Sequence, residues 1–184
     1  MLFKTLQENH ERFIALAGYV LVPVLFILPL AGRNPVTTNY TTAINEPGSS
    51  PLFFLSVPAA LIYEIVLFYL IGLPNSRTWK LRCTALAVLT FAAIFIPYHE
   101  NPDAVSDIHV LCGFLVFLLI NSLLFEALQY DAKLRSFYLC GLLTVFLVTI
   151  TWMAVSGLSE ILYGSLLSVC LTALYIKQLR GCNS

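Results

Sequence analysis

Six long apolar stretches, separated by shorter polar ones, dominate the pattern of this chain. Each is close to the ~20 residues that an α-helix needs to cross a bilayer. They lie at about 13–31, 52–73, 82–98, 108–128, 136–155 and 159–177. The pattern predicts an all-α fold, in which residues 1–184 form a single integral membrane bundle of six transmembrane helices.

Composition agrees with lipid as the solvent of this chain. Charged residues make up 11% of the sequence, whereas soluble domains carry roughly 25%. The formal net charge is +0, so we expect no attraction to nucleic acid. The five cysteines are scattered and form no CxxC motif, which argues against a disulfide framework and against thiol redox chemistry.

Basic residues predict the orientation of the bundle. If six helices alternate across the bilayer, nine of the ten Lys and Arg residues fall on one side, and Arg33 is the exception. The positive-inside rule makes that side cytoplasmic, together with both termini. Five acids fall in the opposite loops: Glu46, Glu100, Asp103, Asp107 and Glu160. We therefore expect the acidic loops to be extracellular or lumenal, and any site to lie on that face.

Glu64 lies near the middle of the second apolar stretch. An ionised carboxylate at this depth costs ~2.5–3.5 kcal/mol on insertion scales, so we expect an interior-facing side chain that is protonated or paired. Ser56, Ala60 and Tyr63 share its helical face, which is small and polar. Such an acid can couple proton movement, contact a ligand or act as a general acid or base. The structural alternative is a protonated acid that is hydrogen-bonded to another helix.

The connection between the third and fourth stretches carries histidines and acids. It contains Tyr98-His99-Glu100-Asn101-Pro102-Asp103, and Asp107-Ile108-His109 follows. His99, His109 and Asp107 could bind a divalent metal such as zinc, hold a polar headgroup or exchange protons. No HExxH motif occurs, so the spacing is not diagnostic. A solvated loop with Asp107 at a helix N-terminus would explain Asp107, but not His109, which lies about one turn further in.

Glu160 opens the sixth stretch, and small residues follow it at helical spacing: Gly164 and Ser168. Glu160 is either an acid that favours a helix N-terminus or a member, with His109 and Asp107, of one outward-facing pocket. Arg33 is the natural counter-ion for that cluster or for an anionic headgroup. Elsewhere, we expect Asn121 to form interhelical hydrogen bonds and Trp79 to lie in an interfacial belt.

Three short features have a counterpart in a known family. A long first outer loop ends in Asn45-Glu46-Pro47-Gly48-Ser49-Ser50-Pro51, the third stretch ends in Phe95-Ile96-Pro97, and Asp107-Ile108-His109 opens the fourth. In these features the chain resembles the Frag/DRAM/Sfk group of six-span membrane proteins and their bacterial relatives. The resemblance implies a six-span topology and singles out Asp107 and His109. Eukaryotic members are associated with lipid-anchor remodelling, membrane-lipid organisation and autophagy, but the resemblance implies no defined reaction.

Three functions remain open from the sequence. The first is a non-catalytic protein that binds a membrane lipid or a small polar-headed ligand in an outward-facing pocket, with Glu64 and Tyr63 deeper. The second is a small transporter or substrate-binding subunit that uses Glu64, and at this size it would need a homo-oligomer or a partner membrane subunit. The third is a metal-dependent intramembrane lipid hydrolase.

Overall fold

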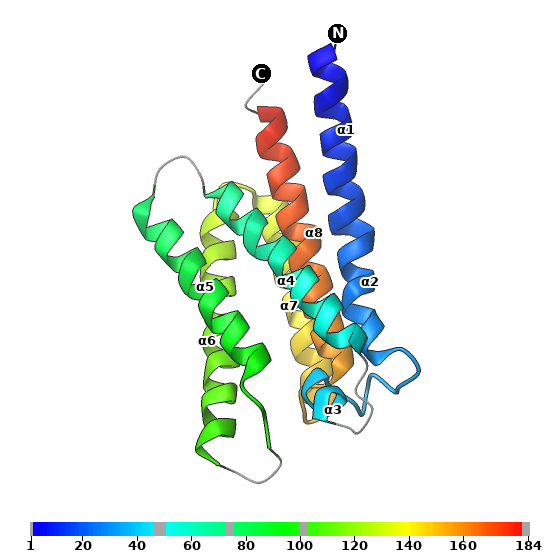
Figure 1. The fold of residues 1–184 in the computed structure, drawn as a ribbon. Coiled ribbons are helices and arrows are strands. Elements are labelled where there is room, and N and C mark those ends of the chain that lie inside the picture. The colour runs from blue at the N-terminus through cyan, green and yellow to red at the C-terminus, as the bar shows by residue number, and fades with distance from the viewer. Residues whose placement is uncertain (1, 46–50, 73–75, 100–102, 182–184) are drawn as a thin grey trace.

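The chain folds into a bundle of long helices (Figure 1). The structure is a computed structural model, which describes residues 2–45, 51–72, 76–99 and 103–181. In these ranges every regular element is helical, and six helices are long and apolar enough to cross a membrane. The predicted all-α fold with six spans is confirmed, and the chain has the architecture of an integral multi-pass membrane protein.

The first span consists of four consecutive helical pieces: α1 (Leu2–Leu16), the π-helix η1 (Ala17–Leu21), α2 (Val22–Ile27) and the 3₁₀ turn η2 (Leu28–Leu30). A short helix, α3 (Tyr40–Asn45), follows. The remaining spans are α4 (Pro51–Ile71), α5 (Arg77–Phe95), α6 (Ala104–Ala127), α7 (Ala132–Thr151) and α8 (Gly157–Gly181). Successive spans run in opposite directions. Both termini therefore lie at one end of the bundle, the terminal end, and α3 lies at the other, the α3 end (Figure 1).

Several helices begin about one turn before their apolar stretch, because a polar side chain caps the first turn. Ser76 accepts a hydrogen bond from the Trp79 amide ahead of α5, and Asp103 and Asp131 cap α6 and α7 in the same way. At its other end α5 stops at Phe95, earlier than the apolar pattern suggests. Ile96 precedes a proline and is extended, which is the conformation that a following proline favours.

The first span departs from a regular α-helix at its prolines. In a π-helix each amide donates to the carbonyl five residues earlier. Pro23 follows the π-helical turn and has no N–H, so the Gly18 carbonyl receives no hydrogen bond from it. The Ser168 hydroxyl of α8 donates to that carbonyl at 2.8 Å. A Cβ on Gly18 would lie 1.8 Å from the Thr172 Oγ1 atom, so only glycine lets α8 approach this closely.

α8 is the central helix of the bundle. It packs against α1, η1, α2, α4 and α7, and a larger share of it is buried than of any other described span. In the α5–α6 hairpin, α5 packs against α4, and side chains of α6 contact α7 and α8. Trp79 is buried and its Nε1 donates to the Phe68 carbonyl at 2.8 Å. Trp79 therefore packs inside the bundle, in the first turn of α5, and its place at the level of the membrane interface stays a prediction.

Ion pairs gather at the terminal end. Arg180 lies 2.9 Å from Glu11, and Arg82–Glu126 and Lys177–Asp131 are further pairs. The acids Asp103, Asp107 and Glu160 lie at the α3 end, because each stands next to the first residue of α6 or in the first turn of α6 or α8. Assignment of the terminal end to the cytoplasm stays a prediction from the basic residues.

Candidate functional site

Glu64 is buried inside the bundle, as its position in an apolar stretch predicts. Only 2% of its surface is exposed, and Ser56 and Ala60 are buried along the same face of α4. Its Oε1 atom has no hydrogen-bond partner. The structural alternative, an acid satisfied by a neighbouring helix, is therefore not realised at this oxygen.

No positive charge in the described part of the chain acts on Glu64. The titratable side chains that interact with it electrostatically are tyrosines: Tyr40, Tyr63, Tyr138 and Tyr163. The Tyr63 hydroxyl donates to the Ile14 carbonyl at 3.1 Å and so must accept from the Thr172 hydroxyl at 2.9 Å. Tyr63 thus connects α4 to α1 and α8 through its hydroxyl.

Glu160 fastens the first loop to the start of α8. Its Oε2 atom accepts from the Tyr40 amide, the first of α3, at 2.8 Å. Two backbone bonds lie beside it, from the Gly157 amide to the Thr38 carbonyl at 3.0 Å and from the Leu158 amide to the Pro35 carbonyl at 2.7 Å. We call these three bonds the α8 clamp. Glu160 also lies in the first turn of α8, where a carboxylate suits the helix dipole.

Tyr40 interacts electrostatically with both acids. Its hydroxyl donates to the carbonyl of Phe26, in the helical turn before Pro29, and its ring meets the edge of Phe53 at 5.8 Å between centroids. Burial raises the pKa of Tyr40, and negative charge on Glu160 or Glu64 would raise it further. The Tyr40 hydroxyl is therefore a neutral hydrogen-bond donor, held near both carboxyl groups.

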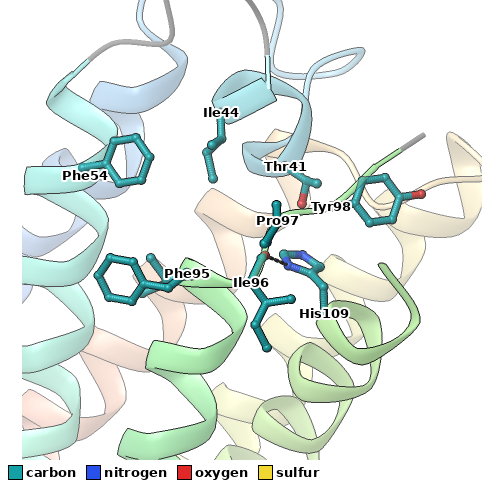
Figure 2. A pocket seen from close by; sticks show the side chains of 9 residues that line it. Thr41, Ile44, Phe54, Phe95, Ile96, Pro97, Tyr98 and His109 are labelled. Carbon is teal, nitrogen blue, oxygen red and sulfur yellow. Dashed lines mark hydrogen bonds between the residues drawn. The ribbon is translucent and has the colours of Figure 1, made fainter. Parts of the chain in front are cut away.

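His109 lies at a groove at the α3 end (Figure 2). Its Nδ1 lies 2.8 Å from the Ile96 carbonyl, which can only accept, so Nδ1 carries a hydrogen. The ring is half-buried, and its centroid is 5.7 Å from that of Tyr98. The groove has a volume of about 170 Å³. We call it the His109 groove, and its lining residues are Thr41, Ile44, Phe54, Ile94, Phe95, Ile96, Pro97, Tyr98 and His109.

The other described residues of the predicted acidic and histidine cluster do not line this groove. Asp107 is exposed in the first turn of α6. His99 is exposed, and its Nδ1 lies 2.6 Å from Asp103. The bond from His99, together with the Ser106 amide and hydroxyl, holds the pKa of Asp103 below its usual range. Arg33 donates to the Ala43 carbonyl at 3.4 Å.

These positions bear on the zinc hypothesis. Among the residues that the structure describes, no three His, Cys, Asp or Glu side chains lie close enough to hold a metal ion. The proposed ligands His99, His109 and Asp107 therefore do not form such a group. Glu100 of the same loop lies outside the described residues.

Glu160 lines a second groove, between α7 and α8, with a volume of about 200 Å³. Its walls are mostly apolar, and its lining residues are Phe117, Leu142, Val145, Phe146, Thr149, Val155, Ser159, Glu160 and Tyr163. Since His109 does not line this groove, the two predicted partners face different described cavities.

A buried polar network lies beside the second groove. Asn121 of α6 donates to the Tyr163 hydroxyl at 2.9 Å and accepts from the Tyr138 hydroxyl at 2.8 Å. The predicted interhelical role of Asn121 is confirmed. Its two tyrosine partners were not predicted, because a tyrosine in an apolar stretch resembles any other large core residue.

In the part of the chain that the structure describes, fold and site define a six-span membrane protein with a buried acid, a groove at His109 and another at Glu160. The chain matches no protein-family model, no curated protein and no solved structure.

Proposed function

We propose that this protein binds one amphiphilic molecule, such as a membrane lipid, in the His109 groove. The observation that carries the proposal is a polar imidazole, fixed by the Ile96 carbonyl, in a groove with otherwise largely apolar walls. The groove lies where α5 ends and α6 begins, a level at which headgroups meet acyl chains. An apolar tail fits against Phe54, Ile94 and Phe95, and a headgroup fits beside His109.

The chemistry of the headgroup follows from the imidazole and its surroundings. With Nδ1 committed to Ile96, the neutral ring offers Nε2 as an acceptor. Acids gather in the loops at this end, among them Asp103 and Asp107, and they repel an anionic headgroup. A lipid with a hydroxyl or amine donor therefore fits better than an anionic one. The resemblance to the Frag/DRAM/Sfk group belongs to this proposal, because its eukaryotic members are associated with membrane lipids.

Lipid titration of the purified protein, followed by native mass spectrometry, tests the proposal. The probes are phosphatidylethanolamine, which has an amine donor, and phosphatidylcholine, which has none. His109→Asn keeps a donor for the Ile96 carbonyl but removes Nε2. Because one hydrogen bond contributes about 0.5–1.5 kcal/mol, we expect roughly a 2- to 10-fold weaker binding of phosphatidylethanolamine and little change for phosphatidylcholine.

A second pair of variants tests the groove itself. Ile94→Trp fills the groove and should weaken binding of both lipids, whereas Val88→Trp, on the exposed face of the same helix, should not. Equal binding by the wild type, His109→Asn and Ile94→Trp would refute the proposal.

A further inference from the structure

Two buried polar atoms on α4 have no hydrogen-bond partner, and they lie on the same face of the helix. They are Oε1 of Glu64 and Oγ of Ser56, the only such side-chain atoms in the part of the chain that is described. Glu64 is 2% exposed and Ser56 3%. Ala60 lies midway between them, and about 12 Å of helix separates the two residues. Buried polar groups are almost always bonded to protein or to water, so this pair indicates hydration along the face.

The two directions away from Glu64 differ sharply. Toward the terminal end the buried face of α4 continues with Leu67, Phe68 and Ile71, which belong to the largest apolar cluster of the bundle. Toward the α3 end the buried face also carries Val57 and Phe53, but it includes the small Ala60 and then Ser56, whose hydroxyl is polar. A buried hydroxyl on this side of Glu64, and none on the other side of the same face, gives water a hydrogen-bonding partner only here. Access to Glu64 is therefore expected from the α3 end.

The charges around Glu64 favour its neutral form. It interacts electrostatically with Tyr40 of α3, Tyr63 of α4, Tyr138 of α7 and Tyr163 of α8, and these hydroxyls carry no charge at neutral pH. α2 has no titratable side chain. With no cation in the described chain acting on it, an ionised Glu64 would lose its hydration without compensation.

We propose that Glu64 is a proton-binding site with access from the α3 end only, along the face of α4 that carries Ala60 and Ser56. On release, the carboxyl O–H bond breaks and the proton passes to a water molecule, which forms hydronium and leaves a carboxylate. Further water molecules carry the proton over the roughly 12 Å of helix to Ser56, whose hydroxyl can accept a hydrogen bond from one water and donate one to the next. Uptake reverses these steps, and solvent water is the only co-reactant.

Tyr40 covers the route at its outer end. It packs on the cluster of Val22, Phe26 and Ala60, and its ring contacts Phe53, one turn before Ser56. The α8 clamp fixes its backbone through Glu160. Opening of α3 would therefore expose the route, which couples proton exchange at Glu64 to the first loop. The proposed site shares no residue with the His109 groove, so either proposal can fail alone.

Infrared spectroscopy of the protein in lipid nanodiscs tests the site. A protonated Glu64 gives a carboxylic acid C=O band that Glu64→Gln removes and Glu126→Gln leaves in place. Glutamine is nearly isosteric with the protonated acid, so this variant should fold. If it does not, Glu64→Asp assigns the band by shifting it. In D₂O the band should move as the acid proton exchanges.

The route is tested by the rate of that exchange. Ser56→Ala removes the relay hydroxyl and should slow the exchange severalfold. Ser168→Ala is the matched control, because this equally buried hydroxyl is already bonded to the Gly18 carbonyl, and the rate should not change. Three results would each overturn the proposal: no acid band that depends on Glu64, a band that does not exchange in D₂O, or the same rate in Ser56→Ala as in the wild type.

Discussion

The clamp at Glu160 gives the sharpest test of how the first loop is held. Glu160→Ala removes the acceptor of the Tyr40 amide, which belongs to the first turn of α3 and has no partner within that helix. A hydrogen bond to a charged group contributes about 1.5–3 kcal/mol. Since Glu160 is only half-buried, we take the lower end, about 1.5–2 kcal/mol, which corresponds to roughly a 10- to 30-fold rise in local opening.

Amide hydrogen exchange of the peptide that contains Tyr40 measures this opening directly. Glu160→Gln keeps an acceptor oxygen at the same place but loses its charge, so we expect a smaller rise than in Glu160→Ala. Asn39→Ala removes the cap on the Thr42 amide and leaves Glu160 in place, so it should expose Thr42 more than Tyr40. If Glu160→Ala leaves exchange at Tyr40 unchanged, the clamp does not hold α3.

Three further predictions concern the helix contacts and one cap. Gly157→Ala should destabilise the protein by about 1–3 kcal/mol, because the new Cβ would lie 2.4 Å from the Thr38 backbone carbonyl. In thermal unfolding in detergent, each kcal/mol should lower Tm by about 2–4 °C. Ser168→Ala leaves the Gly18 carbonyl without its donor and should cost about 0.6–1.7 kcal/mol in the same assay. Acid should fray the first turn of α6, because the folded protein holds the pKa of Asp103 below its usual value. The stability that this cap contributes is complete above the usual aspartate pKa of about 3.9 and is lost as the pH falls through the lowered pKa. Amide exchange in this turn, measured against pH, can follow the loss.

Each of these predictions has a matched control. A Cβ on Gly113 meets nothing within 4 Å, so Gly113→Ala should not destabilise, and equal losses in the two glycine variants would show that the Thr38 contact is irrelevant. Thr144→Ala removes an exposed hydroxyl that bonds only within its own helix, and its Tm should match the wild type. Asp103→Asn cannot titrate, so any pH dependence of α6 that survives in it must come from another group.

The helices were predictable because the length and apolar composition of each stretch depend on the membrane around that stretch alone. An apolar stretch of bilayer length has few alternatives to a membrane helix, and the cost of a mid-span carboxylate predicts that Glu64 faces the interior. Boundaries shifted by about a turn, since the capped first turns of α5, α6 and α7 are polar and lie outside the apolar pattern.

The contacts of the site residues could not be read from the chain in the same way. The partner of Glu160 is a backbone amide 120 residues earlier, and every residue type except proline has one. Trp79 was expected at the interface from its residue type, but its packing inside the bundle, where Gly72 just after α4 leaves room for its ring, was not. A glycine near a helix end is a weak signal, but it is the one that could have indicated this packing.

The central position of α8 has a consequence for how the protein is made. During synthesis the chain leaves the ribosome from its N-terminus, so α8 is the last of the six spans to enter the bilayer. Until then α1, α2 and α4 lack the surface against which much of their buried face packs. The polar groups that meet there, such as the Gly18 carbonyl, have no partner in α8 during this interval. The packing of the first and second spans is therefore completed only when the sixth span has entered the bilayer.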